Sequence, residues 1–352
     1  VGLGPLITEM VLSLSAELLE AEDLETRLLD HVFYPSLPDG RRIAVPGEVA
    51  GPLIRAFQEL TGLTGSLHAA DAKRVHALAE ALDGAGYSFV GLDVLQALAD
   101  ALVRLSDPET VPVPPALAAD LRPYQRQGLG WLMALAQAGF GGVLADDMGL
   151  GKTLQALALL VTRQSSPGGA GRPSLAIVPT SLVGTWVGEA ARFAPDLRVL
   201  VLHGPDRAAR FKDIAKSDLV ISTYSLLRRD ADLLTAEEWD TVILDEAQAV
   251  KNPASQAAKL IRDLSAVQRI ALTGTPVENR LEELWAIMDW ACPGLPGTRA
   301  NFRETWWSPI EDEGSQWHAN RLAARVRPFL LRRTKEDVAA DLPAKTVIIE
   351  SV

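Results

Sequence analysis

Cysteine is almost absent from this sequence, because Cys292 is the single cysteine among 352 residues. One cysteine excludes a disulfide scaffold and any zinc site built on thiolates. The five histidines are scattered and never stand at the spacing of metal ligands, which argues against a zinc hydrolase. Long apolar runs are also missing: the stretch from Leu154 to Val161 is far shorter than the roughly 20 residues of a membrane helix. No basic-then-apolar leader opens the chain, so we expect a cytoplasmic protein.

Basic residues are scarce in the first third of the chain. Residues 1–110 carry 17 acidic and 7 basic side chains, whereas residues 111–352 carry 28 and 27. Almost all of the net charge of −11 therefore belongs to the first region, and the second could still present a local basic groove. A solvated surface is the simpler explanation of the acidic region, and a protein partner that docks on it is the alternative.

The length predicts two or three domains at roughly 100–200 residues each. Residues 1–110 contain no chemical motif and are predicted to form a mostly helical accessory domain. A proline-rich stretch then marks a domain boundary, and we assign 111–120 as the linker. Apolar residues recur at helical spacing within the accessory domain over 6–30, 70–82 and 94–105.

After the linker, short apolar runs alternate with helical stretches. Runs of four to six residues fit strands that are buried on both faces of a parallel sheet. The alternation predicts an α/β domain with a mainly parallel, doubly wound sheet. The predicted strands are Gly142–Ala145, Ser174–Val178, Val199–Leu202, Asp218–Ser222, Thr241–Leu244 and Arg269–Leu272.

A candidate phosphate-binding loop joins the first predicted strand to a helical stretch. Glycines at 149 and 151 let the backbone wrap an oxyanion, Lys152 can reach the phosphates and Thr153 can ligate magnesium. The strict pattern has glycine where this chain has Asp146. A glycine-rich turn with a surface lysine is the alternative.

Acidic and hydroxyl side chains end two later strands. Asp245 and Glu246 follow a hydrophobic strand, where one carboxylate can hold Mg²⁺ and the other can polarise an attacking water. The segment Thr273–Pro276 follows the next strand and could sense the nucleotide. Helix capping is the alternative for both groups.

These segments, together with several others, resemble those of Swi/Snf-family DNA translocases, which belong to superfamily two of the helicase-like ATPases. Asp146 in place of glycine is usual for that family. Phe329–Val338 looks like the family's link from the first to the second RecA-like lobe. The N-terminal region resembles the accessory segment of bacterial members. The motifs stand in the family's order as Leu121–Gln125, Asp146–Thr153, Val178–Leu182, Ser222–Tyr224, Asp245–Gln248 and Thr273–Pro276.

The resemblance implies an ATP and magnesium site. Gln125 would recognise the adenine edge, with Arg122 and Tyr124 shaping the pocket. Thr153 and Asp245 would place the magnesium ion, and the catalytic residues would be Lys152, Asp245 and Glu246, with Glu246 as the base. The phosphate loop would comprise Asp147, Met148, Gly149, Leu150, Gly151, Lys152 and Thr153, and the residues coupling ATP to motion would be Gln248, Thr273, Gly274 and Thr275.

The resemblance also implies contacts with the backbone of double-stranded DNA, which position a strand without reading its sequence. For Lys251 a plain solvated lysine is an equally good interpretation. Trp285 and Trp290 fit the core of a helix better than a base-stacking platform, whereas Trp306 and Trp307 leave DNA clamping and lobe packing open. The implied DNA-binding residues are Pro179, Thr180, Ser181, Ser222, Thr223, Tyr224, Lys251 and Asn252.

We therefore expect residues 121–328 to form an ATP-binding RecA-like lobe with a C-terminal helical insertion. Residues 329–352 would be the connector toward a second lobe, in a longer polypeptide of which this chain is a part. The predicted function is the ATP-hydrolysing motor lobe of a DNA translocase that displaces DNA-bound proteins, working in a bacterial cytosol or nucleoid.

Three other functions are weighed against this one. The first is an RNA-directed helicase of the same superfamily, and the second is an ATP-binding interaction clamp with incidental turnover. The third, a small-molecule kinase, leaves Thr273–Pro276 and Phe329–Val338 without a role. Stimulation of hydrolysis by DNA separates a motor from a clamp.

Overall fold

The computed structural model divides the chain into two compact units, residues 1–103 and 104–352. In the first unit, β1 (Val32–Phe33) pairs antiparallel with β2 (Val45–Pro46). The helices predicted over 70–82 and 94–105, and nearly all of that over 6–30, lie outside the described residues. The structure describes residues 27–34, 44–48, 50–51, 111–165, 171–253, 255–274 and 280–338.

The second unit is built on a seven-stranded sheet in which every strand pair is parallel. The spatial order is β5-β6-β4-β7-β8-β3-β9. All six predicted strands are present, so the α/β class with a doubly wound sheet is confirmed. The bounds are β3 (Gly142–Leu144), β4 (Ser174–Val178), β5 (Val199–Val201), β6 (Leu219–Thr223), β7 (Glu238–Asp245), β8 (Ser265–Leu272) and β9 (Leu330–Leu331).

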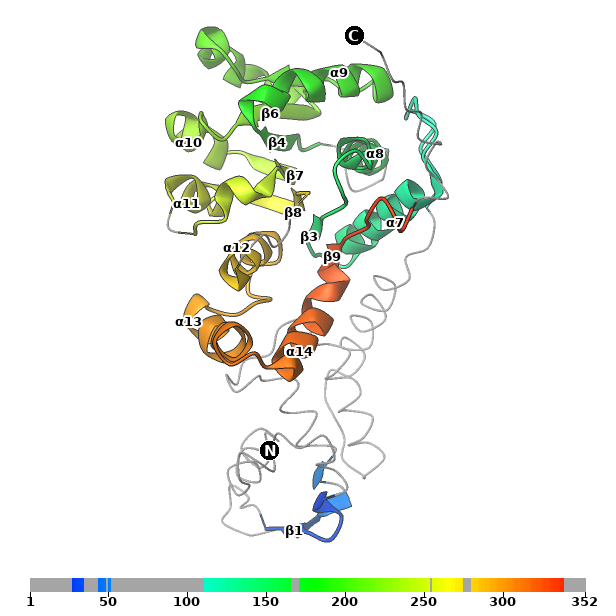
Figure 1. Cartoon of the computed structure of the whole chain (residues 1–352). Helices are drawn as coiled ribbons and strands as arrows, with labels where there is room; N and C mark the ends of the chain where they lie inside the picture. Colours follow the sequence, from blue (N-terminus) through cyan, green and yellow to red (C-terminus); the bar gives the residue numbers. More distant parts are fainter. Residues whose placement is uncertain are drawn as a thin grey trace, which may run out of the picture. The chain divides into compact units, whose positions relative to one another are not determined.

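Helices cover both faces of this sheet, which explains the apolar character of its strands. Every residue of β3, β4 and β6 is buried. Figure 1 shows α7 and α8 on one side of the strands and α10, α11 and α12 on the other. The helices are α7 (Pro123–Gln137), α8 (Lys152–Gln164), α9 (Val183–Phe193), α10 (Leu227–Thr235), α11 (Gln256–Arg262), α12 (Leu281–Ala291), α13 (Arg299–Phe302) and α14 (Gln316–Val326).

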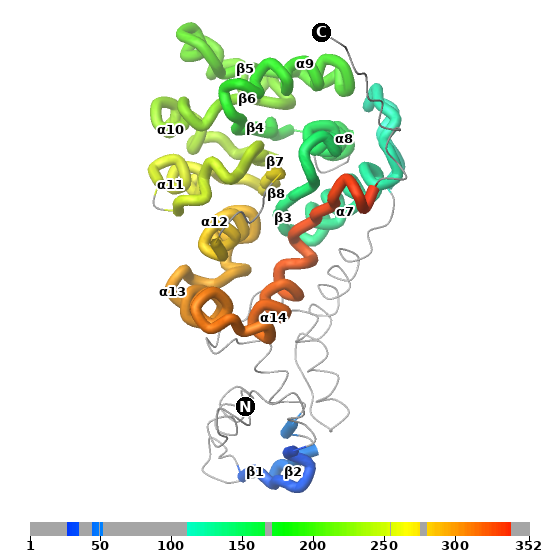
Figure 2. Tube along the Cα trace, in the orientation of Figure 1, coloured from blue at the N-terminus to red at the C-terminus, as the bar shows by residue number. Residues whose placement is uncertain are grey.

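Shorter helical segments connect these elements. A π-helix, η5 (Arg303–Asp312), carries Trp306 and Trp307, whose side chains are half-buried. Figure 2 follows the trace through these turns and back to the sheet beside β3. No helix in the described part of the chain has the length and apolar character that crossing a membrane requires. The 3₁₀ segments are η2 (Thr180–Leu182), η3 (Pro205–Lys216), η4 (Ala247–Val250) and η6 (Arg327–Phe329).

The segment predicted as a connector is part of the sheet. Leu330 and Leu331 form β9, which pairs parallel with Val143 and Leu144 of β3. Phe329 is fully buried, with its ring edge-on to that of Phe140 at 5.0 Å between centroids. A strand of two residues is too short to show a periodicity in the sequence, so only the fold reveals it.

The tryptophans of α12 belong to the core, as predicted. Trp285 is 7% exposed and Trp290 is 3% exposed, and their indole N–H groups donate to the carbonyls of Gly297 and Ile261. Cys292 follows the helix as an inert thiol, because burial raises its pKa to about 12.

Candidate functional site

The predicted site residues gather along one edge of the sheet. Parallel strands place their carboxyl ends together, which is where ligands bind in open α/β folds. The segment after β6 lies next to that after β4, followed by those after β7, β8 and β3. The segments after β6 and β4, which are expected to contact DNA, therefore lie on one side of Asp245 and Glu246. The phosphate loop lies on the other side of this acidic pair.

The phosphate loop has the backbone that anion binding needs. Gly149 and Gly151 have φ angles of +89° and +79°, which are strained for any residue with a side chain. Gly151 is the N-cap of α8, so the free amides of the first turn face the loop. Met148 is 68% exposed at the loop surface, whereas Leu150 is buried.

Lys152 lies within this loop among carboxylates. Its ammonium donates to the carbonyl of Asp146 over 2.6 Å and to that of Asp147 over 3.4 Å. Burial lowers the pKa of Lys152, and Glu246, Asp146, Asp245 and Asp147 oppose this by stabilising the cation. The balance leaves a partly desolvated cation, which attracts a phosphate more strongly than an exposed one does.

The residues expected to recognise adenine are held against the phosphate loop. Tyr124 Oη and Gln125 Nε2 both donate to the carbonyl of Leu150, over 3.1 and 3.2 Å. Gln125 Oε1 accepts the backbone N–H of Arg122 over 3.0 Å, which fixes the amide. A Cβ at Gly151 would lie 2.6 Å from Gln125 Nε2, so this close approach requires glycine.

Asp245 ends β7 as a buried carboxylate with several donors. Trp186 Nε1 donates to its Oδ2 over 2.8 Å, and the N–H of Glu246 donates to its Oδ1 over 3.0 Å. Tyr224 Oη donates to its backbone carbonyl over 2.8 Å. Burial raises the pKa of Asp245, whereas the Trp186 hydrogen bond lowers it. Burial also raises the pKa of Tyr224 well above its usual value, so this phenol keeps its proton.

Glu246 is linked to the residues expected to couple ATP to motion. It has a φ of +49°, unique among the non-glycine residues that the structure describes, and such strain is typical of functional sites. Its Oε2 accepts from Gln248 Nε2 over 2.7 Å, and Gln248 Oε1 accepts from Thr273 Oγ1 over 2.9 Å. The acidic segment, residues 245–248, and the residue that follows β8 are therefore joined in one hydrogen-bond network.

Gly274 also lies beside the phosphate loop. A Cβ there would come within 3.1 Å of Met148 Cγ and 4.0 Å of Lys152 Nζ. Thr275 and Pro276 lie outside the described residues.

The donor set fits a magnesium ion that is completed by phosphate oxygens. Magnesium in nucleotide sites usually takes one or two protein ligands together with phosphates and waters. Thr153 and Asp245 supply a hydroxyl and a carboxylate, and Asp245 lies near enough to Lys152 to stabilise its charge. Within the described ranges, no three histidine, cysteine, aspartate or glutamate residues form a metal cluster.

The residues expected to contact DNA divide into two groups. Thr180 and Ser181 are exposed after β4, and Asn252 is exposed after the acidic segment. Pro179 and Tyr224 are half-buried, and Lys251 pairs with Glu283 of α12 over 3.1 Å. The role of these residues in DNA binding stays a prediction.

Two of the predicted DNA contacts have buried side chains. Ser222 and Thr223 are fully buried in β6, where Ser222 Oγ donates to the carbonyl of Leu202 over 3.5 Å and Thr223 Oγ1 pairs with Ser225 Oγ over 3.0 Å. The exposed hydroxyl at this strand end belongs to Ser225. Alternation along a strand could not separate these residues, because both faces of β6 are covered.

Sequence reasoning missed two residues, Trp186 and Arg333, whose side chains donate hydrogen bonds to carboxylates of the candidate site. Trp186 lies on α9, and its apolar spacing indicates only a core residue. Arg333 lies in the predicted connector, yet it binds Asp146. The one signal in the sequence was Asp146 itself, since a buried aspartate needs a cationic or amide partner.

The sequence of this chain matches a known protein family and several known proteins. A family model described as the SNF2-related domain matches residues 124–352. The chain is 40% identical over 275 residues to YwqA of Bacillus subtilis (strain 168), a protein named as an ATP-dependent helicase/translocase. This match covers 75% of the chain and 29% of YwqA. The chain is also 36% identical over 269 residues to the TATA-binding protein-associated factor mot1 of Schizosaccharomyces pombe, covering 70% of the chain and 14% of that protein.

A solved structure shares both sequence and fold. The SWI2/SNF2 ATPase core of Sulfolobus solfataricus in complex with dsDNA is 40% identical, with a TM-score of 0.62, over 67% of this chain and 49% of that chain. The chain spans less than a third of the length of the curated relatives named above. The predicted resemblance and the RecA-like fold of the second unit are both confirmed.

Two substitutions separate nucleotide binding from hydrolysis. Lys152→Ala removes the cation that would contact phosphate and no core packing, so we expect loss of hydrolysis with the fold intact. Glu246→Gln removes the residue expected to act as the base and leaves Asp245, so we expect bound, unhydrolysed ATP and a kcat lower by about 10²–10⁴. Titration calorimetry and steady-state hydrolysis measure the two effects.

A kcat for Lys152→Ala close to that of the unaltered chain would contradict the site assignment. An ATP affinity for Glu246→Gln that falls as severely as that of Lys152→Ala would assign Glu246 a different role.

Proposed function

Because the chain belongs to the SNF2-related family, we propose that it is the ATP-binding motor lobe of a double-stranded-DNA translocase. The protein would use ATP hydrolysis to track along one strand of the duplex without full unwinding, and would displace proteins bound there. The relative solved with dsDNA supports duplex DNA as the track.

One observation carries this proposal: Asp245 is held from both segments that are expected to contact DNA. Trp186 lies on the helix that begins directly after Thr180–Leu182, and its indole donates to the Asp245 carboxylate. Tyr224 ends the β6 segment and donates to the carbonyl of the same aspartate. A shift of either segment on DNA would therefore move the residue proposed to hold magnesium.

The proposed hydrolysis uses groups along the sheet edge. The amides of the phosphate loop and Lys152 would bind the β- and γ-phosphates of ATP. Bound magnesium would neutralise charge that builds on the phosphates, and Thr153 and Asp245 would hold it. Glu246 would orient a water in line with the γ-phosphate and accept its proton. Gln248 and Thr273, hydrogen-bonded to each other, would pass a change at Glu246 to the end of β8.

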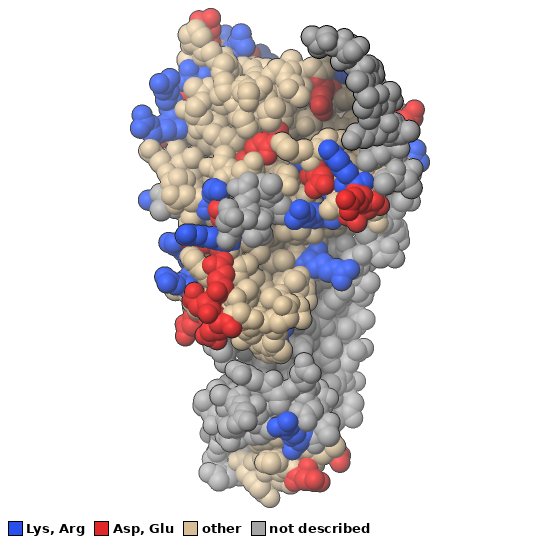
Figure 3. Space-filling model, viewed as in Figure 1, with Lys and Arg blue, Asp and Glu red and all other residues tan. Residues whose placement is uncertain are grey.

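Basic side chains near the β6 segment suit the DNA backbone. On the face drawn in Figure 3, lysine and arginine gather along the margin that carries α10 and α11 in Figure 1. Exposed basic residues of these helices include Arg228, Arg229 and Lys259. Arg228 and Arg229 closely follow Tyr224 in the chain, which supports an extended contact with phosphates that would weaken steeply as salt is raised.

The remaining parts of the proposal concern the larger protein. A second RecA-like lobe would close over the nucleotide and supply an arginine to the γ-phosphate, worth on the order of 10³–10⁵ in rate. The acidic residues 1–110 would repel DNA and could bind a partner protein. The protein would work in the cytosol or on the nucleoid.

The test of the proposed function is the effect of polynucleotides on ATP hydrolysis. We expect duplex DNA to stimulate a protein that continues through a second lobe, independently of base sequence, whereas the chain alone should turn ATP over slowly with little stimulation because it lacks the arginine of that lobe. Duplex RNA should have little effect on either protein at the same nucleotide concentration. Steady-state phosphate release measures this for the chain alone and for a protein that continues through a second lobe. Equal stimulation by RNA would favour an RNA-directed helicase, and no stimulation of either protein would favour a clamp.

The contact between Trp186 and Asp245 gives a separate prediction. Trp186→Phe keeps a buried ring but removes the N–H that stabilises the Asp245 carboxylate, so the pKa of Asp245 should rise further. Since magnesium needs the ionised form, we expect about a tenfold higher magnesium requirement and a pH–rate profile shifted toward higher pH. Hydrolysis measured against magnesium concentration and pH tests this.

Trp285→Phe is the matched control, because its indole N–H donates to Gly297 instead. Equal magnesium requirements in the two variants would show that the Trp186 hydrogen bond has no part in hydrolysis.

A further inference from the structure

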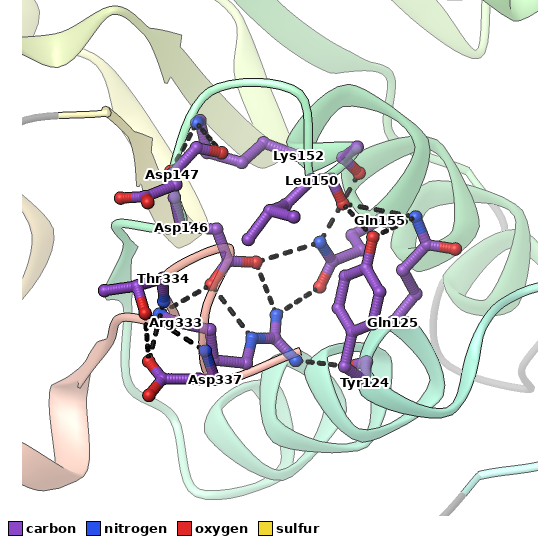
Figure 4. Close-up of polar contacts among 11 residues, drawn as sticks. Tyr124, Gln125, Asp146, Asp147, Leu150, Lys152, Gln155, Arg333, Thr334 and Asp337 are labelled. Carbon is purple, nitrogen blue, oxygen red and sulfur yellow. Dashed lines mark hydrogen bonds and ion pairs between the residues drawn. The ribbon is translucent and has the colours of Figure 1, made fainter. Parts of the chain in front are cut away.

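Arg333 is a buried arginine in the segment that follows β9, and only 9% of its side chain is exposed. Its guanidinium pairs with both carboxylate oxygens of Asp146, with Nε donating to Oδ1 over 2.9 Å and Nη2 to Oδ2 over 2.5 Å. Nη2 also donates to Gln155 Oε1 over 2.8 Å, and Nη1 donates to the backbone carbonyl of Tyr124. Figure 4 shows the guanidinium directed at these three acceptors.

The main chain of the same segment is hydrogen-bonded to residues 145 and 147, where β3 leads into the phosphate loop. Ala145 N–H donates to the carbonyl of Leu331 over 2.7 Å, and Asp147 N–H donates to that of Arg333 over 3.0 Å. Lys335 N–H donates to the Asp147 carboxylate over 3.1 Å. Residues 330–335 therefore lie alongside residues 145–147, and both backbone and side-chain hydrogen bonds join the two segments.

The surrounding sequence is fitted to the pair between Asp146 and Arg333. Asp146 is fully buried, and a buried carboxylate without a cation or donors would strongly destabilise the fold. Gln155 completes its hydrogen bonds, with Nε2 donating to Oδ2 over 3.1 Å. Gly128 leaves room for the side chains of Gln155 and Arg333, because a Cβ at this position would lie 1.9 Å from Gln155 Oε1 and 2.9 Å from Arg333 Nη2. Although glycine is disfavoured inside a helix such as α7, the missing Cβ of Gly128 leaves room for these two side chains.

The three acceptors of Arg333 belong to three parts of the nucleotide site. Asp146 directly precedes the phosphate loop, and its carbonyl accepts from Lys152. Gln155 lies one turn into α8, the helix whose N-terminus faces the loop. Tyr124 lies on α7, where its hydroxyl holds the carbonyl of Leu150.

We propose that Arg333 is a positioning residue of the nucleotide site. It holds the phosphate loop, the first turns of α8 and the helix that carries Gln125 at a fixed spacing, without touching the nucleotide. It also couples nucleotide binding to the conformation of residues 330–338, because a movement of the loop displaces the partners of this segment. The inference rests on the proposed function, since it takes ATP as the ligand.

The first experiment compares Arg333→Lys with Arg332→Lys. Lysine keeps the charge beside Asp146 but cannot reproduce the bidentate fork, so the phosphate loop loses its fixed position. We expect the dissociation constant of Mg·ATP to rise on the order of tenfold or more. Arg332 is exposed and neighbours Arg333 in the chain, so the same substitution there should change the constant less than twofold.

Urea unfolding followed by tryptophan emission checks the fold of both variants. All eight tryptophans lie between residues 131 and 317, so this signal reports on the second unit alone. Equal Mg·ATP affinities of two folded variants would overturn the proposal.

The second experiment needs no variant. Hydrogen exchange of residues 330–338 in the unaltered chain should slow when Mg·ATP is added, while β5 at the opposite edge of the sheet serves as the internal control. Exchange of 330–338 that does not respond to bound Mg·ATP would overturn the coupling. Absence of any Mg·ATP binding by the unaltered chain would instead overturn the proposed function, and this inference with it.

Discussion

The parallel alignment of seven strands in one covered sheet is the constraint on which the rest of the site depends. It brings the carboxyl ends of all strands to one edge, so that residues up to about two hundred positions apart become neighbours. Moving across this edge, the groups change from hydroxyls to carboxylates and then to the glycine-rich loop. The lateral order of the strands therefore sets the order of DNA, magnesium and phosphate contacts in the proposed motor.

Two buried carboxylates flank the phosphate loop, and each is held by residues from outside it. Asp245 accepts from Trp186, and Tyr224 donates to its carbonyl, so both contacts come from the side expected to face DNA. Asp146 accepts from Arg333, which lies in the segment after β9. Both arrangements follow from the same physics, because a buried carboxylate persists only where directed donors surround it. The proposed nucleotide site is therefore hydrogen-bonded to α9 and the β6 segment on one side and to the segment after β9 on the other.

Much of this was predictable from the sequence, for identifiable reasons. Buried parallel strands are apolar on both faces, so short apolar runs such as Ser174–Val178 predicted strands. The glycines of the phosphate loop predicted a backbone that other residues rarely adopt. Contacts across the fold were not predictable. The spacing of Trp186 indicates a core residue but not its hydrogen bond to Asp245, and burial of Ser222 depends on helices that cover β6. The two residues of β9 carry too little pattern to reveal a strand.

The central claim is that the DNA surface and the nucleotide site are joined through Asp245. Thermodynamic linkage tests it most directly, through the affinity for a slowly hydrolysed Mg·ATP analogue with and without saturating duplex DNA. We predict that DNA changes this affinity at least fivefold, and that the analogue changes the affinity for DNA by the same factor. Identical affinities with and without DNA, in a chain that binds both ligands, would contradict the claim.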